Sequence, residues 1–533
     1  MTSVASCALL AAACSSSGPA AQDSQNVVED AVRPRICTAV RGNGDRIFAH
    51  LGSLARVVEE YGLLHGSAGG SSGSITTFVS ESIHLNPLIR RCGECSCSNR
   101  EAGARAALLY KATQGYFEAL TASDEVLAFS ALKPLVDRIA EANLDGIGVD
   151  EVETAREALE TILESPDLRD VVNPEMVDLL RNSPNPAYHV RDLVEMAQSF
   201  GSFDAVDPSI LIRPGLVDFE AAGAKVGRVG SFFAGYEPVD LEGMAGFLDA
   251  CAMPSRGMNW PEASQLSAGT VSCGDLLRQL VVDFRRQVRS GDFPSRIDDP
   301  VGHEGFRSLV ATSVITGDSV GNCEAARADY LAAREWSLDI DFADVRFGFF
   351  GTDRDLNRIA TNPMRYDDLK TDKFIALRSA TWRNALTYSP AEPGIARALE
   401  LGDGMVSAGG WPDLHPVLAL KNMGCDEVVY ITRNGEESQF ALGMARLMNA
   451  SPQRIDALYS LEDSTSAFSR SLQEADATWC TSWGDFSGFD VAGITSDAYN
   501  AAIVSDDPFF RFCGYPRVEA PSQAPLGCGA SLE

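Results

Sequence analysis

The sequence predicts an α/β protein in which buried parallel strands alternate with helices. Residues 36–40 form a short apolar run, which suits a strand that is buried on both faces of a parallel sheet. Glycine-rich turns follow at 42–44 and at 69–73, and a stretch with helical character comes after each of them. A repeated order of strand, turn and helix is that of a sheet covered by helices.

Composition narrows the class of protein and of partner. The chain has 533 residues, 45% hydrophobic and 22% charged, which is ordinary for a globular protein of one large domain with insertions or of two or three domains. Its formal net charge of −30 would repel phosphates, so we expect no nucleic-acid partner and no loose docking on anionic lipid.

The amino-terminal residues 1–14 are similar to a bacterial lipoprotein signal, in which a cysteine after small residues is lipidated. Cys14 is the expected lipidation site, although the residues before Cys7 fit the lipobox pattern better. No Lys or Arg precedes the apolar run, and a disordered Ala/Ser-rich tail is the alternative. Residues 15–34 are polar and predict a linker. After residue 14 no apolar run reaches the roughly 18–20 residues that cross a bilayer. Thirteen cysteines favour an oxidising compartment, so we expect an exported protein of the cell envelope or a secreted one.

The loop after the first predicted strand begins with Gly42 and Gly44 and opens a helix that runs to about Tyr61. Glycines at this place expose backbone N–H groups that can hold an anion. A dinucleotide site is the competing interpretation. It lacks the third glycine of the fingerprint and the acidic residue at the right distance after a second strand.

The stretch from Gly69 to Gly73 has the G-x-S-x-G spacing of a nucleophile elbow, with Ser71 at its centre. A serine on a tight strand-to-helix turn needs neighbours without a Cβ, because the backbone there is crowded. The following helix would direct its N-terminus at the hydroxyl, where it favours negative charge. The strand before the elbow is expected at 63–66 and is weak.

Together these two stretches resemble the patatin-like phospholipase family, whose bacterial members carry a glycine-rich loop, a helix and then G-x-S-x-G. The departures are Asn43 and Ile47, where the family usually has glycine. The matching positions are Gly42, Gly44, Arg46, Ala49, His50, Gly52, Leu54, Glu60, Gly62, Gly69, Ser71 and Gly73.

The family's second signature is an Asp-Gly pair far downstream, and the sequence has two such pairs. Asp145 lies in a helical stretch and predicts a turn. Asp403-Gly404 has the better context, since 374–380 resembles the family's strand ending in Ser-Ala and the spacing from Pro416 to the last strand is also similar. Met405 and a few extra residues before Pro416 depart from the family.

The resemblance implies a three-layer α/β/α sandwich with a mostly parallel central sheet, spanning residues 35–449. Residues 98–300 would be a large helical insertion, and 450–533 an extension beyond the family domain. Further strands are expected at 309–316 and 345–350.

The resemblance also implies hydrolysis of lipid or phospholipid acyl esters by a Ser-Asp dyad, without metal or cofactor. Ser71 would be the nucleophile and Asp403 the base, shielded from water because a carboxylate is a weak base for an alcohol unless its pKa is raised. Backbone N–H groups would form the oxyanion hole, and an acyl-enzyme would form on Ser71. The oxyanion-hole residues would be Asn43, Gly44 and Asp45, with Arg46 as an anchor of the loop.

Other interpretations stay open. His415 could complete a Ser-Asp-His triad. A second alternative is a non-catalytic lipoprotein that binds lipid or a partner on a decayed hydrolase scaffold. Ile47 and Met405, which depart from the family's pattern, favour it. Three cysteines at 92, 95 and 97 favour disulfides over zinc, because no partner pair lies nearby. His50 is expected to be structural.

Overall fold

The computed structural model describes seventeen stretches of the chain. They are residues 34–42, 47–92, 95–121, 149–166, 168–182, 213–236, 241–250, 267–268, 271–290, 294–316, 328, 346–361, 374–391, 396–410, 416–433, 474–481 and 498–499.

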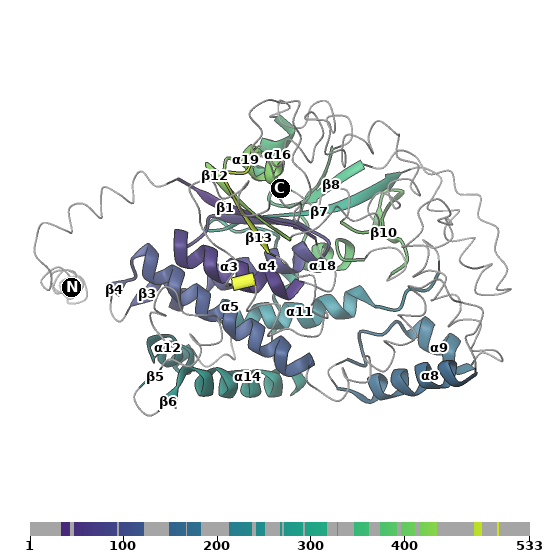
Figure 1. Ribbon diagram of the computed structural model, residues 1–533. Helices are drawn as coiled ribbons and strands as arrows, with labels where there is room; N and C mark the ends of the chain where they lie inside the picture. The colour runs from purple at the N-terminus through teal and green to yellow at the C-terminus, as the bar shows by residue number, and fades with distance from the viewer. Residues whose placement is uncertain are drawn as a thin grey trace, which may run out of the picture.

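The described part has mixed α/β character and is built on a nine-stranded, mostly parallel sheet (Figure 1). Its main path runs β10-β11-β7-β2-β1-β12-β13, and β8 lies on the other side of β7 with β9 beyond it. Pairing is parallel from β7 through β2, β1 and β12 to β13, and also between β8 and β9. It is antiparallel where β7 meets β8 and β11, and within the hairpin β10–β11. The strands of this sheet are β1 (Ile36–Val40), β2 (Gly66–Gly70), β7 (Arg307–Thr316), β8 (Arg346–Phe350), β9 (Phe374–Leu377), β10 (Leu399–Gly402), β11 (Met405–Ser407), β12 (Glu427–Arg433) and β13 (Ala477–Thr481).

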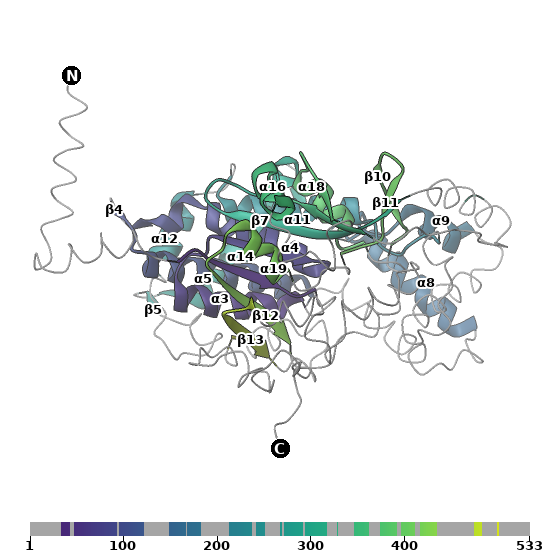
Figure 2. The same ribbon diagram turned by 90° about the horizontal axis from the view of Figure 1, so that it is seen from above.

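Helices cover both faces of the sheet. Figures 1 and 2 show α16 and α19 on one face, while α3 and α4 lie on the other with α5 and α11 packed beyond them. Helix α14 forms a further layer below α5 (Figure 1). The helices are α3 (Phe48–Tyr61), α4 (Ser72–Leu85), α5 (Asn99–Thr121), α8 (Val149–Glu164), α9 (Pro174–Asn182), α11 (Phe219–Ala234), α12 (Leu241–Ala250), α14 (Cys273–Ser290), α16 (Asp353–Thr361), α18 (Trp382–Tyr388) and α19 (Val417–Met423), with the 3-10 turns η2 (Pro87–Arg90) and η5 (Arg296–Asp298).

Several predicted elements are present. The strands expected at 36–40, 309–316 and 345–350 correspond to β1, β7 and β8. The strand before the elbow is displaced from the expected 63–66, because β2 begins at Gly66 and runs into the first two residues of the motif. Strand β13 lies within 450–533, the stretch expected to be an extension, and it pairs with β12 as part of the main sheet.

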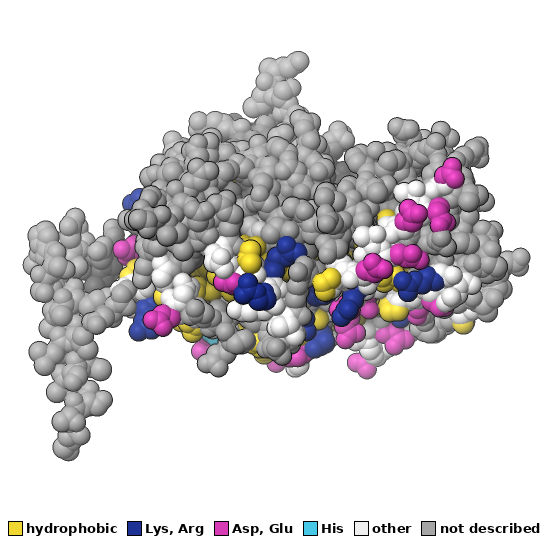
Figure 3. Space-filling view, turned by 90° about the horizontal axis from the view of Figure 1, so that it is seen from below, with side chains coloured by type: hydrophobic (Ala, Val, Ile, Leu, Met, Phe, Trp, Pro, Cys, Tyr) yellow, Lys and Arg dark blue, Asp and Glu magenta, His cyan; other side chains and the backbone are white. Residues whose placement is uncertain are grey.

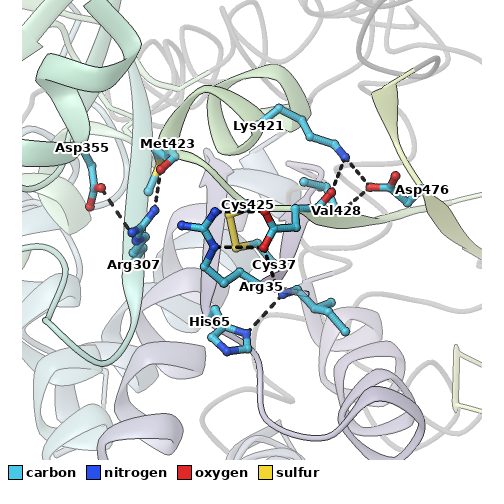
Figure 4. Close-up of a disulfide and its surroundings, with 12 residues drawn as sticks. Arg35, Cys37, His65, Arg307, Asp355, Lys421, Met423, Cys425, Val428 and Asp476 are labelled. Carbon is cyan, nitrogen blue, oxygen red and sulfur yellow. Dashed lines mark hydrogen bonds and ion pairs between the residues drawn. A yellow bond between two sulfur atoms is a disulfide. The ribbon is translucent and has the colours of Figure 1, made fainter. Parts of the chain in front are cut away.

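Two disulfides are present among the described residues. One joins Cys37 in β1 to Cys425, just before β12, across 388 residues of sequence (Figure 4). The other joins Cys92 to Cys97 in the short hairpin of β3 (Arg91–Cys92) and β4 (Cys95–Ser96). Such bonds persist in oxidising compartments, which agrees weakly with an exported protein. Within the described residues, no helix is long and apolar enough to cross a membrane.

Ionic contacts surround the first disulfide. Arg35 pairs with Asp426 through both carboxylate oxygens, and Lys421 pairs with Asp476 at 2.6 Å (Figure 4). The guanidinium of Arg35 lowers the pKa of Asp426 to about 2. The Asp476 carboxylate also accepts the Val428 N–H, so it ties the start of β12 to the turn before β13.

A fully buried ionic cluster fixes α4 beneath the sheet. Glu81 of α4 is 0% exposed and pairs with Arg296 of η5, which is 1% exposed. The same carboxylate accepts hydrogen bonds from the Gly302 N–H at 3.0 Å, the Trp382 indole N–H at 2.9 Å and the Ser308 hydroxyl. Helix α4, strand β7, η5 and α18 therefore meet at one carboxylate.

The surface of the described part carries mixed charge. On the face in Figure 3, acidic side chains gather towards the end where α8 and α9 lie, with single basic side chains among them. The helix α8 alone has the sequence VDEVETAREALETILE. Such a face repels anionic partners.

Candidate active site

Ser71 lies where β2 ends and α4 begins. It is the N-cap of this 14-residue helix, with φ 53° and ψ −129°, and it is one of three described residues other than glycine with positive φ. That conformation is costly for a residue with a Cβ and persists only where the surroundings impose it. A strained serine at the N-terminus of a helix, at the carboxyl end of a parallel strand, has the local geometry of a nucleophile elbow.

The two motif glycines are required by close backbone packing. A Cβ on Gly69 would lie 2.4 Å from the carbonyl carbon and oxygen of Gly73. A Cβ on Gly73 would lie 2.6 Å from the Val40 carbonyl oxygen, at the end of β1. The turn is therefore crowded, as the sequence predicted, and it also packs closely against the neighbouring strand β1.

The same packing brings the start of the predicted oxyanion loop to the elbow. Strands β1 and β2 are parallel neighbours, so their carboxyl ends share one edge of the sheet. Arg41 and Gly42 continue from β1 at this edge. The predicted oxyanion-hole residues and the predicted anchor (Asn43, Gly44, Asp45 and Arg46) follow directly but lie outside the described residues.

His50 has the structural role expected of it. It is fully buried on α3, and its Nδ1 lies 2.8 Å from the Thr76 hydroxyl of α4. A backbone hydrogen bond also joins its ring to Arg41. Burial lowers the pKa of His50 to about 3, so the ring is neutral at pH 7. It braces the two helices that follow the two glycine turns.

Ser389, directly after α18, holds the elbow from the other side. Its hydroxyl accepts the Ser71 N–H at 3.0 Å and donates to the Ala311 carbonyl at 2.7 Å. Its own carbonyl accepts the Gly410 N–H at 2.7 Å. A Cβ on Gly410 would meet the Ser71 nitrogen at 2.3 Å, so only glycine fits there without a shift of the backbone. Sequence reasoning missed both residues, since neither belongs to the motifs that were recognised.

The segment after β11 meets the end of β2 along the same strand. Gly70 is paired with Ala311 of β7, whereas Met405 is paired with Thr316 farther along it. Between these two points, the Gly409 carbonyl accepts the Ser313 N–H at 2.7 Å. The chain therefore runs back along β7 from Met405 and reaches the elbow at Gly410.

This register separates Asp403 from Ser71. Ala311 and Thr316 are about 17 Å apart along a strand, and Asp403 lies beyond Met405 at the turn of the hairpin. The hairpin projects at the edge of the molecule (Figure 2). Asp403, with φ 52°, and Gly404 are both exposed, so the expected shielding from water is not observed. The pair forms a tight hairpin turn, and the structure does not bring the predicted base to the predicted nucleophile.

The residue beside Ser71 instead belongs to the run Ala408-Gly409-Gly410. Ala408 is fully buried, and its N–H donates to the Ser313 hydroxyl at 2.8 Å. Among the described residues, no carboxylate or imidazole forms a hydrogen bond with Ser71. His415, the other predicted base, lies outside the described residues, as does the predicted lipidation site Cys14.

Water has little access to this site. Ser71 is 4% exposed and Ser72 is 6% exposed. In the described part of the chain no cluster of His, Cys, Asp or Glu has the arrangement of a metal site. The described residues therefore present the hydroxyl of Ser71, whose backbone is strained, at a helix N-terminus. The Ser389 and Ser74 hydroxyls and the backbone of Gly410 hold this turn in place.

No family model, no curated protein and no solved structure matches the chain.

Proposed function

We propose that the chain is a serine acyl hydrolase that cleaves acyl esters of lipids, with Ser71 as its nucleophile. The observation that carries the proposal is the backbone of Ser71, held at φ 53° between a parallel strand and a helix N-terminus. Strain of this kind is retained at sites where a side chain has to be presented in one orientation.

The chemistry proposed for this site is acyl transfer in two steps. The Ser71 Oγ attacks the ester carbonyl, the alcohol leaves with a proton, and an acyl-enzyme forms; water then releases the fatty acid. The N-terminus of α4 favours the negative charge of the oxyanion, because its first N–H groups have no acceptor within the helix. The loop after β1 starts beside Gly73, and in this proposal its backbone would supply further N–H donors.

The base is the part of the dyad that the geometry does not support. Asp403 was predicted from an Asp-Gly pair, and that pair lies at an exposed hairpin turn. We therefore assign no proton transfer to Asp403. His415 remains the alternative base inherited from the sequence.

A fluorophosphonate probe tests the proposal. Its phosphorus is attacked by an activated serine hydroxyl and fluoride leaves, so labelling reports the nucleophile without a choice of lipid. We expect wild-type protein and Asp403→Asn to be labelled at rates within about threefold of each other, and Ser71→Ala not to be labelled. A loss of at least 100-fold in His415→Ala would identify the base. Failure of folded wild-type protein to react would refute the proposed function.

Lipid specificity follows from a second assay. Hydrolysis of p-nitrophenyl esters of increasing acyl length should depend on Ser71 and favour long chains over acetate. We also propose that the mature protein is exported and anchored to a membrane through lipidated Cys14. Metabolic labelling with a palmitate analogue, lost in Cys14→Ser and retained in Cys7→Ser, would support this anchor.

The second candidate is a non-catalytic lipoprotein that binds lipid or a partner on a hydrolase scaffold. The separation of Asp403 from Ser71 favours it, as does the absence of an acid or imidazole bonded to Ser71 within the described residues. Unlabelled but folded protein that binds vesicles of neutral phospholipid would favour this second function.

A further inference from the structure

We propose that Ser389 is a positioning residue for Ser71, which holds the nucleophile in its strained conformation through the Ser71 amide. The expected effect on the reaction rate of Ser71 rests on the proposed function, whereas the expected effect on the backbone of Ser71 rests on the structure alone. Ser389 belongs to none of the motifs that identify the elbow, and 318 residues separate it from Ser71.

Two groups of contacts fix the peptide units on either side of Ser71. On the carboxyl side, the Ser71 carbonyl accepts the Ser74 N–H at 2.9 Å and the Ser74 hydroxyl at 2.6 Å. Both of those donors belong to α4 itself. On the amino side, the Ser71 N–H donates to the Ser389 hydroxyl. Ser389 is thus the contact that sets φ of Ser71 from outside the helix.

The Ser389 hydroxyl is itself held in one orientation. It is fully buried, and its proton is directed to the Ala311 carbonyl at 2.7 Å, which leaves a lone pair for the Ser71 N–H at 3.0 Å. Ala311 is the β7 residue paired with Gly70, so the hydroxyl joins the elbow to the strand beside it. Gly410 closes over this contact and allows nothing larger than hydrogen.

This arrangement also assigns the Ser71 amide. Its N–H is already donated to Ser389, so it is not a donor for an oxyanion. The donors in the proposed reaction have to come from other backbone groups, at the start of α4 and in the loop after β1. In this arrangement the Ser71 N–H fixes the conformation of the turn and does not stabilise the charge of the oxyanion.

Two variants and a matched control test the inference. Ser389→Ala removes the acceptor of the Ser71 N–H. Ser389→Thr keeps the hydroxyl. Ser231→Ala is the control, because Ser231 is also fully buried and its hydroxyl bonds only to Gly227 within α11 among the contacts described. Two quantities are measured in the full chain: the second-order rate of fluorophosphonate labelling, and hydrogen exchange of the Ser71 amide resolved to the single residue by mass spectrometry.

We expect Ser389→Ala to speed exchange of the Ser71 amide by about tenfold or more, because its hydrogen bond is lost. We expect labelling to slow by about 10- to 100-fold, because the nucleophile is displaced. Ser389→Thr should stay within about threefold of wild type in both, and Ser231→Ala should change neither. Should Ser389→Ala not fold, Ser389→Cys replaces it. A thiol is a weak acceptor that keeps part of the hydrogen bond, so amide exchange should be faster and labelling slower than in wild type, by smaller factors than expected for alanine.

The outcomes separate this inference from the proposed function. Failure of the probe to label wild-type protein would refute the proposed hydrolase function. Hydrogen exchange of the Ser71 amide would then decide alone whether Ser389 holds the turn at Ser71. Unchanged exchange in Ser389→Ala overturns the inference whatever the labelling shows. Faster exchange with unchanged labelling of an active wild type would leave a hydrogen bond but overturn the positioning role.

Discussion

Replacing Glu81 by glutamine should strongly destabilise the protein, because its carboxylate joins α4 to η5, β7 and α18. One oxygen accepts from Arg296 and the Trp382 indole, and the other accepts from the Gly302 N–H and the Ser308 hydroxyl. A glutamine amide has a single acceptor oxygen, so it can accept from only one of these two pairs of donors. Its NH₂ then faces the Gly302 N–H, and that partly buried donor loses its partner.

The charge makes the larger contribution. Arg296 is 1% exposed and would keep only Asp299, whose side chain is 36% exposed, as an anionic partner. Removing one member of a buried ion pair typically costs about 3–5 kcal/mol, and an unsatisfied buried N–H about 1–3 kcal/mol. Since Asp299 compensates in part, we expect a total loss of about 3–5 kcal/mol in the free energy of unfolding.

Urea denaturation followed by tryptophan fluorescence would measure this loss. The control is Asp426→Asn, which breaks a bidentate pair whose side chains are 44% and 47% exposed and should cost at most about 1 kcal/mol. In a double-mutant cycle with Arg296→Met, the double variant should lose at least 1 kcal/mol less than the sum of the single variants. A Glu81→Gln variant within 1 kcal/mol of wild type would refute the reasoning.

Three further predictions follow from other parts of the structure. Gly73→Ala should cost about 1–3 kcal/mol in urea unfolding and slow probe labelling, because its Cβ would lie 2.6 Å from a carbonyl oxygen of β1; an unchanged stability and rate would contradict the packing described. Burial lowers the pKa of both His50 and His84 to about 3, so between pH 6.5 and 3 the unfolded chain binds more protons than the folded one. The free energy of unfolding should therefore fall as pH decreases through this window, by up to about 1.4 kcal/mol per pH unit for each histidine, and urea melts of His84→Gln at pH 6.5 and 5 should show a shallower fall than wild type. Replacing Cys37 and Cys425 together by serine should cost about 2–5 kcal/mol, because the bond closes a loop of 388 residues; a melting temperature equal to that of wild type would count against it.

The sequence was sufficient for the elbow because its signal is local. Gly69 has to be glycine because a Cβ there would meet Gly73 only four residues later, and the helix that follows is contiguous with the motif; the contact that excludes a Cβ on Gly73 comes from Val40 of the neighbouring strand. The strand before it was placed too early, since β2 has the sequence GSAGG and lacks the apolar residues by which strands are recognised. Those small residues let neighbouring backbones approach: a Cβ on Gly66 would lie 2.5 Å from the Arg307 carbonyl oxygen.

The second half of the site could not be predicted in the same way. An Asp-Gly pair is a turn signal wherever it occurs, and only the register of β11 on β7 shows that Asp403 lies far from the elbow. Ser389 carries no signal in the sequence, because its role depends on a contact across 318 residues. Glu81 likewise carries no signal in the sequence, because its partners come from η5, β7 and α18.

The order of strands in the sheet has a consequence for folding during synthesis of the protein. Strand β1 lies between β2, which follows it within 30 residues, and β12, which is made almost 400 residues later. As the chain leaves the ribosome, one edge of β1 gains its partner β2 early, while the other edge stays open until β12 has been made. An open strand edge is a site for pairing with other chains. The nascent protein is thus exposed to aggregation at this edge until β12 has been made, and the bond between Cys37 and Cys425 can form only once Cys425, just before β12, has been synthesised.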